Sequence, residues 1–71
     1  MRIPRIYHHG AIALNQEFAL NDDAANHVGR VLRMPVGSEL LLFNGDGFNY
    51  PARISSSDKK RVNVIAQAQQ D

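Results

Sequence analysis

The sequence predicts a mainly β fold with one α-helix, closed into a small and partly open β-barrel. The chain has 71 residues, 44% of them hydrophobic and 21% charged, which suits one globular domain and excludes a second. Short stretches of strand-like alternation are separated by turn-forming residues, and one stretch alone has apolar residues at helical spacing. Many short strands with a single helix favour a small barrel that carries the helix.

Two short strands are predicted ahead of the helix, at Arg5–His8 and at Glu17–Leu20. Pro4 favours an extended backbone at the start of the first strand. The residues between the strands, 10–16, are weakly patterned and predict a loop.

The helix is predicted to begin after Asn21 and to end near Arg33 or Met34. Asn21 is a favoured N-cap residue, and the two acidic residues that follow suit the first turn of a helix. Pro35 forces Met34 out of helical geometry. Apolar residues at helical spacing predict one buried stripe: Ala24, Ala25, Val28, Val31 and Leu32. The opposite face carries Asn26, His27, Arg30 and Arg33.

Three strands are predicted after the helix. Glu39–Phe43 is an apolar run, and 44–47 (NGDG) is a strong hairpin signal that leads into a return strand. Pro51 cannot donate to a ladder, so it predicts that this strand is an edge or is bulged there. Residues 55–59 predict a polar turn, and 61–68 alternate again. The expected core is Val28, Val31, Leu32, Leu40, Leu42, Phe43, Val62 and Val64.

The basic residues fall into three local clusters, although the net charge is only +1. They are Arg2 with Arg5, Arg30 with Arg33, and the run 59–61. Such clusters either converge on a phosphate-binding patch or are ordinary solvated surface. Tyr7, beside Arg5, is either a platform for an RNA base or a core strand residue.

The sequence predicts no catalytic residue, no metal site and no cofactor in this chain. There is no cysteine, no nucleophile elbow and no glycine-rich phosphate loop. His8 and His9 point to opposite faces of a strand, so with His27 they make a poor metal site. No apolar run approaches the ~20 residues of a membrane span, and the N-terminus lacks the apolar core of a secretion signal.

Three stretches resemble the RsmE-type ribosomal RNA methyltransferases. Residues 26–33 (NHVGRVLR) look like the His-x-x-x-Val-Leu-Arg signature of that family, and residues 2–7 (RIPRIY) are similar to its start. Gly37 followed by 40–45 (LLLFNG) resembles its Gly-Asp…Leu-Phe-Asp-Gly stretch. Ser38 and Asn44 depart from the pattern, since acidic residues are common at both positions.

The resemblance implies that residues 1–68 are a PUA-like RNA-binding β-barrel and that 69–71 begin a linker to a C-terminal SPOUT domain, which this chain lacks. That domain is expected to bind S-adenosylmethionine, to form a homodimer and to methylate N3 of a uridine in small-subunit ribosomal RNA. The resemblance thus implies a cytoplasmic enzyme of ribosome biogenesis, of which this chain alone is inactive and only recognises RNA.

The resemblance turns His27, Arg30 and Arg33 from a solvated face into candidate RNA contacts. With the other basic clusters and the residues beside Arg5, the candidate contacts are Arg2, Arg5, Tyr7, His8, His27, Arg30, Arg33, Lys59 and Lys60. The other hypothesis that the sequence leaves open is a protein-interaction barrel that does not bind RNA. Salt dependence separates the two, because phosphate binding weakens steeply with salt and an apolar interface does not.

Overall fold

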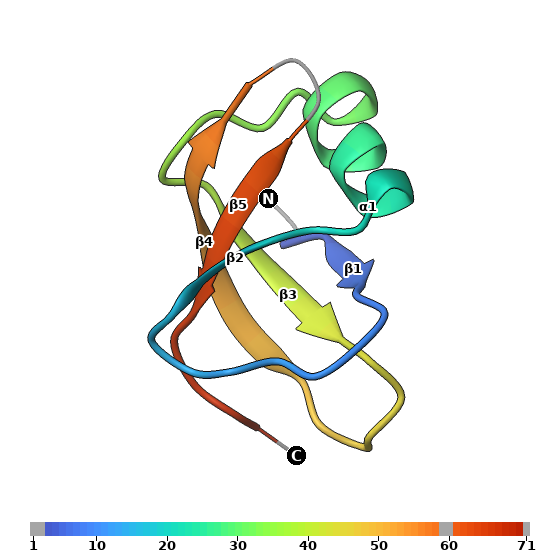
Figure 1. Ribbon diagram of the computed structural model, residues 1–71, viewed down its shortest axis with the longest axis vertical. Helices are drawn as coiled ribbons and strands as arrows, with labels where there is room; N and C mark the ends of the chain where they lie inside the picture. The colour runs from blue at the N-terminus through green and yellow to red at the C-terminus, as the bar shows by residue number, and fades with distance from the viewer. Residues whose placement is uncertain (1–2, 59–60, 71) are drawn as a thin grey trace.

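Five strands form one sheet in the order β1-β3-β4-β5-β2, and a single helical segment packs against it (Figure 1). The computed structural model describes residues 3–58 and 61–70. The elements are β1 (Arg5–Tyr7), β2 (Glu17–Ala19), α1 (Asp22–Asn26), the π-helical turn η1 (His27–Val31), β3 (Glu39–Phe43), β4 (Tyr50–Ser57) and β5 (Val62–Ala66). The expected mainly β fold with one helical segment is confirmed.

The sheet combines one parallel pair with three antiparallel pairs. Strand β1 runs parallel to β3, with Ile6 opposite Leu42, and all other neighbours are antiparallel. The predicted hairpin joins β3 to β4, and Asp46 tightens it by accepting a hydrogen bond from the Phe48 amide at 2.9 Å. Leu14 bridges to Ala66, so the chain ahead of β2 also joins the β5 edge and helps to curve the sheet.

The core lies on the inner face of the curved sheet and under the helix. Alternate residues of β3, β4 and β5 point inward, as the period of a strand requires. The buried apolar residues are Ile6, Leu20, Ala24, Ala25, Val28, Leu40, Leu42, Tyr50, Ala52, Ile54, Val62, Val64 and Ala66. The expected core positions on the strands are confirmed except for Phe43, which is only half-buried.

The second half of the predicted helix stripe is wrong. Val28 is fully buried, but Val31 is 63% exposed and Leu32 is 39% exposed. The Leu32 amide donates to the His27 carbonyl at 2.9 Å, five residues back, so η1 is wound more widely than an α-helix. The wider turn changes the angle between successive residues, which carries Val31 and Leu32 away from the core.

Asn21 stands at the N-cap position, but its side chain does not cap the helix. Its amide oxygen accepts from the His9 backbone N–H, and its amide nitrogen donates to the His9 carbonyl at 3.4 Å. The side chain therefore ties the start of α1 to the loop that follows β1.

Pro51 lies in β4, a central strand, so the prediction of an edge strand is wrong. The bulge lies between Ile54 and Ser56, not at Pro51, and β4 continues to Ser57 through the predicted turn. Proline is tolerated because it stands opposite Gln67, one residue beyond the end of β5. There its carbonyl accepts from the Gln67 amide at 2.7 Å, and the position of its missing N–H faces the same residue beyond β5. On its other side Pro51 pairs with Leu41 of β3, whose amide donates to the Pro4 carbonyl instead.

The residues expected to begin a linker are hydrogen-bonded to the start of β4. Asn49 and Gln70 exchange backbone hydrogen bonds of 2.6 and 2.7 Å. The Tyr50 hydroxyl donates to the Asp46 carboxylate and accepts from Gln69 Nε2 at 3.1 Å. The bond to Asp46, followed by burial, raises the pKa of Tyr50. In the described part of the chain, no helix is long and apolar enough to span a membrane.

Candidate nucleic-acid interface

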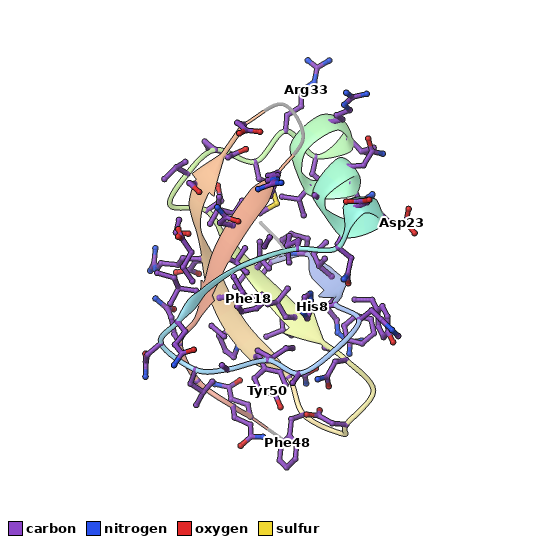
Figure 2. The ribbon with its side chains drawn as sticks, viewed as in Figure 1. His8, Phe18, Asp23, Arg33, Phe48 and Tyr50 are labelled. Carbon is purple, nitrogen blue, oxygen red and sulfur yellow. The ribbon has the colours of Figure 1, made fainter. Side chains whose placement is uncertain are left out.

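The exposed arginines lie at the C-terminal end of the helical segment or just beyond it. His27, Arg30 and Arg33 are all exposed, as the sequence predicts. Arg33 follows the last helical turn with φ of 52°, in the left-handed region that side-chain-bearing residues rarely adopt. Figure 2 shows its side chain reaching beyond the end of the helix into solvent. Within residues 3–58 and 61–70, neither Arg30 nor Arg33 forms an ion pair.

Arg61 belongs to the same end of the molecule. The start of β5 lies beside the helical segment (Figure 1), and a Cβ built on Gly29 would stand 3.6 Å from Val62 Cγ2. Arg61 directly precedes Val62 and is exposed. The described member of the third basic cluster therefore neighbours the second cluster. Arg2, Lys59 and Lys60, which the sequence also predicts as contacts, lie outside the described residues.

A second candidate surface lies on the outer face of β1 and β3. The Arg5 guanidinium carbon lies 4.7 Å from the centroid of the Phe43 ring, and Arg5 Nη2 donates to Asn49 Oδ1 at 3.3 Å. Tyr7 packs edge-on against Phe43, with 5.5 Å between ring centroids, and is 50% exposed. We call Arg5, Tyr7 and Phe43 the aromatic ledge. A cation and two rings on an open strand face can stack unpaired bases.

Phe43 was missed as a candidate contact because its place depends on the pairing of β1 with β3. Those strands are separated by more than 30 residues of chain, and a parallel pair leaves no hairpin signal. In the sequence, β3 is a continuous apolar run, and this pattern predicted that Phe43 lies in the core.

His8 does not share the exposed surface of the other candidates. Its side chain is 7% exposed, and its ring lies 4.9 Å from the Phe18 ring, inside the curved sheet (Figure 2). Nδ1 has no hydrogen-bond partner among the described residues. Burial, followed by the nearby His9, lowers the pKa of His8. A neutral buried imidazole is a core residue here, and contact with RNA would require it to leave the core.

The described residues contain no group of three or more His, Asp or Glu side chains that could hold a metal ion.

Comparison with known proteins identifies related sequences and related folds. A family model described as the RNA methyltransferase PUA domain matches residues 20–67. The Buchnera aphidicola ribosomal RNA small subunit methyltransferase E is 35% identical over 63 residues, which make up 89% of this chain and 25% of that protein.

Solved structures have the same fold. A methyltransferase from Legionella pneumophila, in complex with the cofactor SAM, has a TM-score of 0.93 and 40% identity, over 97% of this chain and 28% of its own. Ribosomal RNA small subunit methyltransferase E from Neisseria gonorrhoeae, bound to S-adenosyl methionine, has a TM-score of 0.88 and 26% identity, over 97% of this chain and 29% of its own. The chain thus spans little more than a quarter of these relatives. Because the family model covers most of its length, the chain belongs to the RNA methyltransferase PUA domain family.

Proposed function

We propose that this domain recognises ribosomal RNA for an S-adenosylmethionine-dependent methyltransferase that modifies uracil N3 in small-subunit RNA. The observation that carries the proposal is the pair Arg30 and Arg33, exposed at the end of the helix without an acidic partner among the described residues. A guanidinium fork matches the geometry of a phosphate, and phosphate contacts position an RNA without reading its sequence.

The distribution of charge along the helical segment supports this role. Asp22 and Asp23 occupy the first turn, where their negative charges offset the positive end of the helix dipole. The arginines stand at the other end. The acidic residues are thus kept away from the surface that would meet phosphate. His27, Arg61 and the predicted contacts Arg2, Lys59 and Lys60 would extend the basic surface.

The aromatic ledge would supply a second kind of contact. Phosphate contacts at the helix end hold the RNA backbone, whereas Tyr7 and Phe43 would stack bases that are not paired. Arg5, already seated over Phe43, would lie beside such a base and its phosphate.

Catalysis is proposed to belong to the part of the relatives that this chain does not cover. That part makes up nearly three quarters of the Neisseria protein, whose structure contains S-adenosyl methionine. We propose that it corresponds to a C-terminal SPOUT domain that binds the cofactor and forms the homodimer, and that the 71-residue chain alone transfers no methyl group. The lack of cysteine suits a reducing cytoplasm, where we expect the protein to act.

The test is a filter-binding titration with ribosomal RNA fragments at several salt concentrations. In the variant with Arg30→Ala and Arg33→Ala we expect weaker binding and a flatter slope of log K against log salt. On a single strand, the slope should change by about 0.7 for each phosphate that the variant no longer neutralises. The matched control replaces both arginines by lysine, which keeps the charge and should keep most of the slope. Equal affinity and slope in wild type and the alanine variant would contradict the proposal.

One observation favours a second candidate function, a protein-interaction barrel. Val31, Leu32 and Val36 expose large apolar side chains close together in the sequence, at 63%, 39% and 59%. Such side chains suit an apolar partner. If they are the functional surface, binding of the partner will persist at high salt and the arginine variants will behave like wild type.

A further inference from the structure

A pocket opens beside Arg33, between the end of the helical segment and the starts of two strands. Its volume is about 770 Å³, within the range of small-ligand sites. Leu32, Met34 and Pro35 line one side, and Ile3 with Pro4 lines another. Arg33, Ser38 and Glu39 are the polar groups that line it. The pocket is therefore mainly apolar and carries one cation and one carboxylate.

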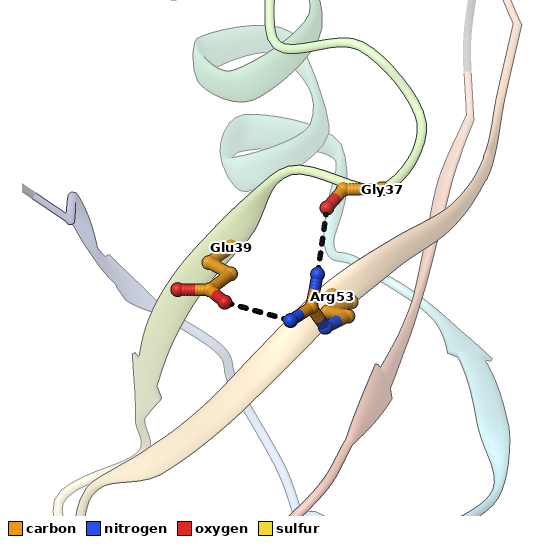
Figure 3. Close-up of polar contacts among 3 residues, drawn as sticks. All are labelled: Gly37, Glu39 and Arg53. Atoms are coloured by element: carbon orange, nitrogen blue, oxygen red, sulfur yellow. Dashed lines mark hydrogen bonds and ion pairs between the residues drawn. The ribbon is translucent and has the colours of Figure 1, made fainter.

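The carboxylate of Glu39 is held in place by its neighbour on β4. Arg53 stands directly opposite Glu39 in the sheet, and its Nη2 donates to Glu39 Oε1 at 2.8 Å. Arg53 Nη1 also donates to the Gly37 carbonyl at 3.2 Å, so the guanidinium is anchored at two points (Figure 3). Figure 3 shows the second carboxylate oxygen of Glu39 turned away from Arg53. That oxygen has no hydrogen-bond donor among the described residues and is open to a ligand.

The position of Arg33 is set by the widened helix end. The Met34 amide donates to the Val28 carbonyl at 3.1 Å. The turn that this bond closes contains Arg33, whose backbone has the left-handed conformation. The backbone thus directs Arg33 toward solvent at the mouth of the pocket, while Leu32 and Met34 on either side of it line the wall.

Apolar walls, a carboxylate with one unpaired oxygen and a nearby cation match the parts of a nucleotide. A base can lie between apolar side chains, a carboxylate accepts from N–H groups on the base edge, and an arginine at the mouth meets the phosphate. Among the four RNA bases, guanine alone presents two adjacent donors, N1–H and the N2 amino group, to a carboxylate. Uracil, cytosine and adenine each place a lone-pair acceptor next to the donor, which a carboxylate repels.

We propose that this pocket binds an unpaired guanine of the RNA, with Glu39 accepting from its Watson–Crick edge and Arg33 contacting the adjacent phosphate. The inference rests on the proposed function, since it names the base that the RNA would place beside the basic helix end. An apolar protein segment suits the pocket less well, because it would bury the second carboxylate oxygen of Glu39 without a donor and leave Arg33 unpaired.

The experiment follows backbone amide NMR signals of Leu32, Met34 and Ser38 while the chain is titrated with GMP, IMP or AMP. IMP keeps N1–H but lacks the N2 amino group, and AMP lacks both donors. We expect GMP to shift these signals and to bind about tenfold more tightly than IMP, because a hydrogen bond to a charged acceptor contributes about that factor, and to exceed AMP by more than that.

Glu39→Gln should abolish the preference for GMP over IMP, since an amide offers one oxygen beside an amino group. The variant keeps an oxygen for Arg53, and the denaturation midpoint checks that it folds like wild type. Glu17→Gln is the matched control, an exposed carboxylate on β2 at the other edge of the sheet, and it should leave the preference unchanged.

Three outcomes would overturn the inference: no shift of these amides with millimolar GMP, equal binding of the three nucleotides, or equal effects of the two glutamine variants. If salt-dependent RNA binding persists in any of these cases, the proposed function stands and the guanine pocket alone fails. If nucleotides bind as expected but the arginine variants bind ribosomal RNA like wild type, the proposed function fails instead.

Discussion

The guanidinium of Arg5 lies over the ring of Phe43, 4.7 Å from its centroid, and joins the first strand of the chain to a strand more than 30 residues later. An exposed cation–π contact of this kind stabilises the fold by roughly 0.5–1 kcal/mol. The contact also holds Arg5 on the aromatic ledge, where it would meet RNA.

Phe43→Leu should therefore affect folding and binding to different extents. We expect the free energy of unfolding to fall by about 1 kcal/mol, while RNA affinity falls by roughly 1–3 kcal/mol if one base stacks on the ring. Urea denaturation and filter binding measure the two effects. Phe48→Leu is the control, because Phe48 packs against the core near the hairpin and outside the ledge. Equal RNA affinities of the two variants would argue against stacking on Phe43.

Leu32→Ala and Leu42→Ala make the same chemical change at two very different positions. Leu42 is completely buried on β3, so its truncation should cost roughly 2–5 kcal/mol of stability. Leu32 is 39% exposed beyond the π-helical turn, and we expect its truncation to cost less than about 1 kcal/mol. Urea midpoints of both variants measure the difference. A large cost at Leu32 would mean that the helix stripe is buried after all.

The strands were predictable because each carries its own signal. The apolar run of β3, the NGDG turn and the alternation of β5 are local features, and the structure places each element where its pattern indicates. The alternation of β5 also predicts which side chains face inward, and Val62, Val64 and Ala66 all point into the core.

The errors arose where backbone geometry departs from the regular period. A π-helical turn inserts one extra residue between hydrogen-bonded partners, and nothing in the helical spacing of Val28, Val31 and Leu32 reveals it. Similarly, the parallel pairing of β1 with β3 depends on contacts across the whole fold. The exposed arginines of the candidate site were predictable from the helix face, whereas the ledge and the pocket require that pairing.

His8 should make stability depend on pH. Its folded-state pKa lies below the ordinary value of 6.5, so the unfolded chain binds the proton more readily. The stability that the neutral imidazole contributes is present above about 6.5 and is lost as pH falls through the lower folded-state pKa. Urea midpoints measured from neutral pH downward should therefore decrease in wild type.

The dependence should be weaker in His8→Leu, which keeps an apolar side chain of moderate size in the core. His27→Gln is the matched control, because it also removes one histidine but from an exposed position outside the core. A His8→Leu profile parallel to that of wild type would show that other groups set the acid limit.

The left-handed backbone at Arg33 leads to a prediction in which stability and binding change in opposite directions. A non-glycine residue with φ of 52° carries a conformational cost that glycine does not, and glycine is the favoured residue just beyond a helix end. Arg33→Gly should therefore stabilise the fold, by up to roughly 1 kcal/mol, because the native conformation suits glycine and the exposed side chain leaves no cavity.

The same variant removes a cation from the proposed RNA surface and should weaken binding and flatten the salt slope. Arg33→Lys separates the two effects, since lysine keeps the charge but, like arginine, places a side chain in the left-handed region, so both its stability and its RNA affinity should stay near those of wild type. Thermal denaturation and filter binding on the three proteins measure both quantities. If Arg33→Gly is more stable and binds RNA as well as wild type, Arg33 has neither a structural nor a binding reason to be arginine, and the proposed interface loses one of its two central residues.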